Sequence, residues 1–157
     1  MGKKGRCAPN NHYISCFFIE RMYIMNNKIR AFLKSCGWYF LASVDEGAAR
    51  VRPMGFCAVL SDGKLYFGMG SDKRCCKQIK ENPEVEVCGC NANKEWLRVR
   101  GKAVFTDDKA VMDEIFAENE FLRKKYSPES GLIFAPFYLE DMDVDFNKMD
   151  GTCEKWV

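Results

Sequence analysis

Short strand-like runs separated by tight turns constrain the fold of this chain more than any other feature. Residues 38–44 and 49–60 read as strands on either side of Asp45-Glu46-Gly47, and Ser61-Asp62-Gly63 leads into a further run at 64–69. Four later runs have the same character, at 85–89, 95–105, 137–146 and 152–157. Because helices do not alternate regularly with these runs, we exclude a doubly wound parallel sheet and predict a mainly β fold, a closed or partly closed antiparallel barrel with helical insertions.

Helical spacing of apolar residues and capping signals predict the insertions. The first helix is expected to begin at Asn26 or Asn27 and to end at Cys36-Gly37. The others are a helix from Ser71 or Asp72 to Glu81 that stops at Asn82-Pro83, a helix after Thr106-Asp107-Asp108, and a short piece over 121–126.

Residues 1–24 differ from the rest of the chain. They sustain no helical or strand period, and they hold four Lys or Arg residues against one acidic residue. We expect a leader that is disordered or that reflects a start assigned too early, with the folded domain at 25–157. Its apolar stretch is too short for a signal peptide, and no run approaches the ~18–20 residues that cross a bilayer. A net charge of +2 gives no support to nucleic-acid binding.

The chain has nine cysteines, an odd number, and no Cys-x-x-Cys pair. This pattern fits neither a secreted disulfide framework nor a zinc ribbon, so no metal site is expected. We interpret the cysteines as reduced and mostly buried, which indicates a cytoplasmic protein. Cys88 and Cys90 alternate onto one strand face, which suits packing. A redox role for these two or for the adjacent Cys75 and Cys76 stays open.

Two segments carry the residues expected to bind a ligand. Arg50-Val51-Arg52-Pro53-Met54 places two arginines on one strand face and a proline that suits a strand edge, although a solvated face would read the same way. Gly70-Ser71-Asp72-Lys73 then joins a strand to a helix that also carries Lys77. Because backbone N–H groups at a helix start attract anions, this turn is a candidate phosphate site.

The two segments in this order resemble the pyridoxamine-phosphate-oxidase-like family of FMN-binding split barrels over about residues 25–157. The resemblance also rests on Phe40-Leu-Ala-Ser-Val-Asp-Glu-Gly47, Lys77-Gln-Ile-Lys-Glu-Asn-Pro83 and Trp96-Leu-Arg-Val-Arg-Gly-Lys-Ala103. It implies a homodimer with FMN between the subunits. The flavin ring would follow Arg50, Val51, Arg52, Pro53 and Met54, and the phosphate would lie near Met69, Gly70, Ser71, Lys73 and Lys77. Trp96 would lie near the flavin from the other subunit or serve as a dimer-core aromatic.

The resemblance implies an oxidoreductase that passes electrons from a reduced donor through FMN to a small-molecule acceptor. The alternatives are a non-catalytic FMN store or electron carrier, a heme-binding protein, or a deazaflavin enzyme on the same fold. The chain lacks the C-terminal Arg-x-His motif of the true pyridoxamine phosphate oxidases, so vitamin B6 oxidation is not expected. Its single histidine, His12, lies outside the expected domain, so no catalytic residue is assigned.

Overall fold

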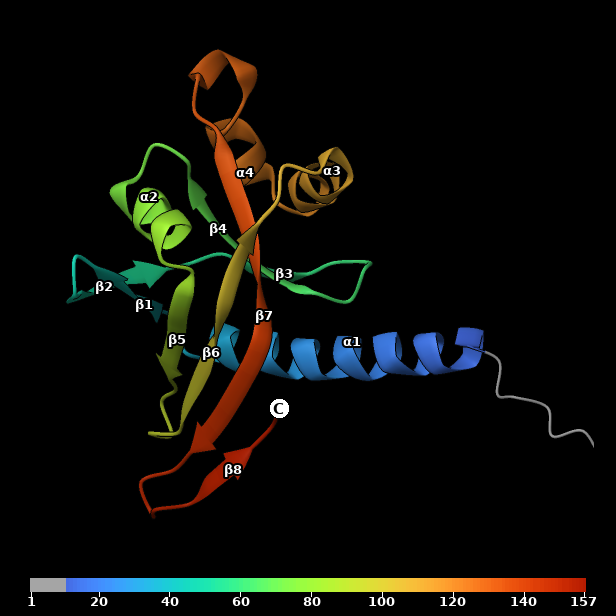
Figure 1. Cartoon of the computed structure of the whole chain (residues 1–157), viewed down its shortest axis with the longest axis vertical. Coiled ribbons are helices and arrows are strands. Elements are labelled where there is room, and N and C mark those ends of the chain that lie inside the picture. The colour runs from blue at the N-terminus through green and yellow to red at the C-terminus, as the bar shows by residue number, and fades with distance from the viewer. Residues whose placement is uncertain (1–10) are drawn as a thin grey trace, which may run out of the picture.

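The structure, a computed structural model, describes residues 11–157 and is built around one curled antiparallel sheet (Figure 1). The strands are β1 (Tyr39–Asp45), β2 (Ala48–Met54), β3 (Cys57–Val59), β4 (Leu65–Gly70), β5 (Glu84–Cys90), β6 (Trp96–Phe105), β7 (Phe134–Asn147) and β8 (Cys153–Lys155). The helices are α1 (Asn11–Ser35), α2 (Arg74–Glu81), α3 (Lys109–Glu118) and α4 (Glu120–Lys125), followed by a short 3-10 turn at Pro128–Ser130.

The strand order β2-β1-β5-β6-β7-β4-β3, with β8 paired to β7, confirms the prediction of a mainly β split barrel. The 14-residue β7 holds this order together, because it pairs with β6 on one side and with β4 on the other. Pro53 lies in the edge strand β2, where its missing N–H leaves no gap in the sheet.

The predicted strand over 49–60 is wrong as a single element. The chain leaves the sheet after Met54 and re-enters it at Cys57, so β2 and β3 are separate strands. The reason is pairing, because β2 is hydrogen-bonded to β1 at one edge of the sheet whereas β3 is hydrogen-bonded to β4 at the other. Gly55 and Phe56 span the opening between the two edges.

Helix α1 begins well before the predicted start at Asn26 or Asn27. It runs unbroken from Asn11, across the sheet and beyond it (Figure 1), so residues 11–24 belong to this helix. Asn26 caps nothing; it is buried in the helix, and its Nδ2 donates to the Gly63 carbonyl at 2.8 Å. Residues 1–10 of the expected leader lie outside the described residues. The start-site hypothesis and the domain limit at 25 stay predictions.

Two apolar clusters hold these elements together. The larger fills the concave face of the sheet beneath α1, with Leu33, Leu41, Phe67 and Val99 fully buried. The smaller cluster packs α3 and α4 against β3, β4 and the start of β7. Strand β4 is buried along its whole length because it separates the two clusters, which places the cluster boundary next to the opening after β2.

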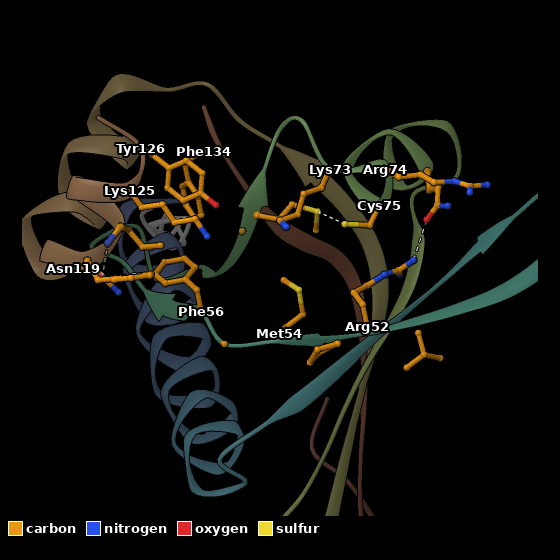
Figure 2. A pocket seen from close by; sticks show the side chains of 18 of the residues that line it. Arg52, Met54, Phe56, Lys73, Arg74, Cys75, Asn119, Lys125, Tyr126 and Phe134 are labelled. Atoms are coloured by element: carbon orange, nitrogen blue, oxygen red, sulfur yellow. Dashed lines mark hydrogen bonds between the residues drawn. The ribbon is translucent and has the colours of Figure 1, made fainter. Parts of the chain in front are cut away.

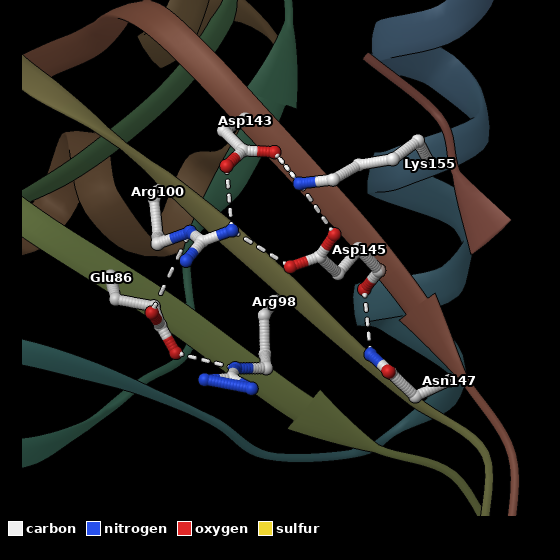
Figure 3. Close-up of polar contacts among 7 residues, drawn as sticks. All are labelled: Glu86, Arg98, Arg100, Asp143, Asp145, Asn147 and Lys155. Carbon is white, nitrogen blue, oxygen red and sulfur yellow. Dashed lines mark hydrogen bonds and ion pairs between the residues drawn. The ribbon is translucent and has the colours of Figure 1, made fainter. Parts of the chain in front are cut away.

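The convex face of the sheet carries a ladder of ion pairs across β5, β6, β7 and β8 (Figure 3). Arg98 Nε lies 3.0 Å from Glu86, Arg100 Nη2 lies 2.6 Å from Asp143 and 2.8 Å from Asp145, and Lys155 pairs with both aspartates. The neighbouring Lys155 and Arg100 lower the pKa of Asp143. Because most of these groups are well exposed, each pair contributes little by itself.

Seven cysteines, from Cys36 to Cys153, are free thiols. Only Cys57 and Cys76 of these seven are buried, so the expectation that the cysteines are mostly buried is wrong. The packing expected for Cys90 is wrong as well, because this residue is exposed. Between residues 11 and 157, no helix is long and apolar enough to cross a membrane. The same residues hold no group of three or more potential metal ligands.

Candidate cofactor cleft

A cleft of about 960 Å³ opens where β2 leaves the sheet. Figure 2 shows Met54 at its middle, with Arg52, Lys73, Arg74 and Cys75 toward one end and Phe56, Asn119, Lys125, Tyr126 and Phe134 toward the other. We call these the α2 end and the α4 end. The volume is that of a site for a ligand of cofactor size.

The charged side chains that line the cleft are all cationic. They are Arg50, Arg52, Lys73, Arg74 and Lys125, and no aspartate or glutamate of the described residues joins them in the lining. A pocket with one sign of charge attracts ligands of the other sign. The cleft is therefore built for an anion.

Arg52 is fixed in the cleft by neutral acceptors. Its Nη1 donates to Ser43 Oγ at 2.8 Å and to the Leu41 carbonyl at 3.3 Å, and its Nη2 donates to Gln78 Oε1 at 3.0 Å. Ser43 and Gln78 are 3% and 6% exposed, so their positions are set by packing. Because none of these partners carries a charge, the positive charge of Arg52 stays available to a ligand.

Arg50 and Arg74 differ from Arg52 because they share a carboxylate. Asp45 Oδ2 lies 3.4 Å from Arg50 Nε and 2.9 Å from Arg74 Nη2. Asp45 stands at the end of β1, directly before the turn into β2. It draws the two arginines to the outer rim of the α2 end and offsets part of their charge.

Lys73 is the N-cap residue of α2, directly before Arg74, and no side chain caps this helix. The predicted caps Ser71 and Asp72 are wrong, because the chain makes a further turn after β4 in which Lys73 N–H donates to the Gly70 carbonyl. The uncapped start of α2 leaves backbone N–H groups and the positive end of the helix dipole beside the cleft. Cys75 Sγ lies 3.2 Å from Met69 Sδ in the same wall.

Aromatic rings form the α4 end. Phe134 packs edge-on against Phe56, with ring centres 5.4 Å apart, and its ring centre lies 5.0 Å from that of Tyr126. A Cβ on Gly68 would lie 2.2 Å from the Phe134 ring, so only glycine allows this ring to lie across β4. Burial raises the pKa of Tyr126, which therefore keeps its phenolic proton at neutral pH.

The family model described as pyridoxamine 5'-phosphate oxidase matches residues 25–135. The chain belongs to this family. The match covers β1 to the start of β7 and so includes most of the cleft lining. The predicted family is confirmed. No curated protein matches the sequence significantly.

Solved structures agree with the family. A NimC/NimA family protein from Clostridium acetobutylicum is 29% identical with a TM-score of 0.78, covering 87% of this chain and 94% of its own. A pyridoxamine 5'-phosphate oxidase-related, FMN-binding protein from Nostoc punctiforme is 18% identical, with a TM-score of 0.57 and coverage of 95% and 89%. A heme-binding protein from Mycobacterium smegmatis shares the fold at 13% identity and a TM-score of 0.63, over 83% of this chain and 57% of its own.

Seven of the eleven residues predicted to bind the cofactor line the cleft of this pyridoxamine 5'-phosphate oxidase family member: Arg50, Val51, Arg52, Pro53, Met54, Met69 and Lys73. Gly70 and Ser71 turn away at the end of β4, where the Ser71 N–H donates to the Ile133 carbonyl. Lys77 lies one turn along α2, beside a smaller hollow at the β1–β2 turn. Trp96 lies at the start of β6, paired with Cys90 and Asn147, and does not line the cleft.

The sequence did not reveal the α4 end of the cleft. Asn119, Phe121, Leu122, Lys125 and Tyr126 lie on or next to a short helix that reads as an ordinary amphipathic piece. Gln78 was also missed. It lies four residues after Arg74 on the same helix, and this spacing places both side chains on one helix face, which could have indicated it. The α4 residues reach the cleft only because β7 returns beside β4.

Proposed function

We propose that the cleft binds FMN and that the protein is an FMN-dependent oxidoreductase. The observation that carries the proposal is the one-sided charge of the cleft: five cations and no carboxylate among its described lining residues, in a fold shared with an FMN-binding protein. FMN combines a phosphate dianion with a large planar ring, so it needs cations at one end and apolar surface beside them. The α2 end and β2 offer both.

The residues present fit the phosphate group. Arg52 donates only to uncharged partners, so no carboxylate neutralises its charge. Lys73 forms no ion pair with any described residue. Both lie beside the uncapped start of α2, whose N–H groups add neutral donors. Met54 and the backbone of β2 continue from this end along the floor of the cleft, where a flat ring would lie.

The protein is proposed to act as a homodimer. An apolar strip on the outer face of β1 and β2 is left uncovered, formed by Trp38, Phe40, Val44 and Val51. Trp38 is 66% exposed and Val51 is 65% exposed, which is unusual for a row of large side chains. Val51 also lines the cleft, so a second copy on this strip would close the open side of the cofactor site.

When bound, FMN would accept electrons from a reduced donor, such as a nicotinamide, and pass them to a small-molecule acceptor. The chain's own residues would bind the phosphate through Arg52 and Lys73, orient the ring along β2 and, through the positive charge of the cleft, stabilise the negative charge of the reduced ring. No aspartate, glutamate or histidine of the described residues lines the cleft. We therefore assign no protein acid or base. The free thiols favour a cytoplasmic location.

The test is purification of the protein followed by its visible spectrum and an FMN titration. We expect an oxidised-flavin spectrum, binding in one equivalent per chain, and steady oxidation of a reduced nicotinamide when an acceptor is added. The double variant Arg52→Ala/Lys73→Ala should bind FMN more than about 100-fold more weakly, because two charge-assisted contacts of about 1.5–3 kcal/mol each are lost. A colourless protein that takes up no added FMN would refute the proposal.

The same spectrum separates the alternatives. A Soret band would identify a heme protein, and uptake of a deazaflavin in preference to FMN would identify a deazaflavin enzyme. FMN binding without turnover over a panel of acceptors would identify a store or an electron carrier.

A further inference from the structure

The α4 end of the cleft holds a second set of polar groups that the cofactor phosphate does not need. Figure 2 places Asn119 and Lys125 across Met54 from Arg52 and Arg74. The two sets come from different elements, α4 in one case and β2 with α2 in the other. A single phosphate held at the α2 end leaves the α4 set free for another ligand.

Each polar group of the α4 set is a hydrogen-bond donor. Asn119 is the N-cap of α4, and its Oδ1 accepts from the Leu122 N–H at 3.0 Å. Because only the oxygen of an amide can accept this bond, the Nδ2 group is left with both of its donors. Lys125 forms no ion pair within the described part of the chain, and its Nζ lies 5.4 Å from the Tyr126 ring centre.

Aromatic surface surrounds these donors. Phe56, Phe134 and Tyr126 form the inner wall, and Phe121 stands at the rim with 70% of its surface exposed. Flat rings bind such walls by edge-on or offset stacking. A pocket with aromatic walls, a few convergent hydrogen-bond donors and no carboxylate side chain selects a ligand that is both flat and anionic.

We infer that the α4 end of the cleft is the subsite for the small-molecule electron donor or acceptor, and that it takes a planar aromatic carboxylate through Lys125 and Asn119. The inference rests on the proposed function, since the bound ring would lie next to the flavin. It adds the class of molecule that this end of the cleft selects.

The test compares benzoate with benzamide, which has the same ring and shape but no charge. Binding is measured on the FMN-loaded protein by calorimetry and by the change in flavin absorbance. We expect benzoate to bind at least fivefold more tightly than benzamide. Lys125→Ala should weaken benzoate by about tenfold and leave benzamide unchanged, because one charge-assisted contact is lost.

Lys124→Ala is the matched control, because Lys124 lies on the same helix, pairs with Glu120 at 2.9 Å and does not line the cleft. It should bind benzoate like the unchanged protein. Equal binding of benzoate and benzamide, absence of binding of both, or equal losses in the two lysine variants would overturn the inference.

Failure of the cofactor proposal gives a different result. If the protein takes up no FMN, the same comparison is made by calorimetry on the protein as purified. A Lys125-dependent preference for benzoate then supports an aromatic carboxylate site at the α4 end but refutes its role beside a flavin, and no preference overturns both. If FMN binds and benzoate shows no preference, only the subsite is refuted.

Discussion

Replacing Arg52 by methionine separates the two roles that the structure gives this residue. The arginine braces two buried side chains, Ser43 and Gln78, and it holds a charge in the cleft. Methionine keeps most of the apolar stem and removes the guanidinium. We expect both the stability of the apoprotein and its affinity for FMN to fall.

The two losses have different sizes. The variant leaves one buried hydroxyl and one buried amide oxygen without a partner, at about 1 kcal/mol each, or about 2 kcal/mol of unfolding free energy. For a domain of this size, that lowers the melting temperature by about 4–8 °C. Loss of a charge-assisted phosphate contact of about 1.5–3 kcal/mol weakens FMN binding by about 10- to 100-fold.

The assays are urea unfolding of the apoprotein and quenching of FMN fluorescence on titration with protein. In both assays, Arg52→Lys should fall between the original protein and Arg52→Met, because a lysine keeps the charge but cannot reach two separated acceptors at once. Arg123→Met, an exposed arginine on α4 outside the cleft lining, should change neither quantity. If Arg52→Met loses stability while its FMN affinity stays within twofold of the original, Arg52 is a brace only and the phosphate site is misplaced.

Three further predictions test the packing, the thiols and the assembly. Gly68→Ala should cost about 1–3 kcal/mol in urea unfolding, because the added methyl overlaps an aromatic ring, whereas Gly55→Ala, with its nearest atom 4.0 Å away, should cost little. Burial raises the pKa of Cys57, so the folded state holds the thiol proton more tightly than the unfolded state does. The stability that this adds is complete below about pH 8.5 and is lost as pH rises. Urea unfolding should therefore show lower stability at pH 10 than at pH 7, with a smaller difference in Cys57→Ala. Phe40→Glu should shift a dimer toward monomer in light scattering, whereas Met149→Glu, at a more exposed apolar residue outside the strip, should not. A dimer unaffected by Phe40→Glu would place the interface elsewhere.

Local patterns predicted most of the fold. Alternation along β5 put Val85, Val87 and Gly89 on one face, and these residues are buried. The turn at Ser61-Asp62-Gly63 joins β3 to β4 as expected. The break between β2 and β3 could not be seen, because the residues from 49 to 60 keep strand character throughout. What divides them is the choice of partner strand, which depends on residues far away in the sequence.

The start of α1 was missed for a similar reason. Asn26 is a good N-cap by type, and propensity alone favours a helix that begins there. In the structure its amide instead reaches the Gly63 carbonyl, 37 residues away, from the middle of a longer helix. A tertiary hydrogen bond thus uses the side chain that a sequence-based analysis assigns to a local one.

The cleft shows which part of such a site a sequence can reveal. The α2 end is assembled from β2 and from the β4–α2 turn, and both of these are short continuous segments with a recognisable pattern. The α4 end comes from an insertion between β6 and β7 that rests on the smaller apolar cluster and on Phe134. Because few of its residues take part in the main core, α4 can change its side chains without disturbing the strand pairing that holds the α2 end. The proposed cofactor site and the proposed subsite for its reaction partner are therefore physically separable in this fold, and family membership points to the first more readily than to the second.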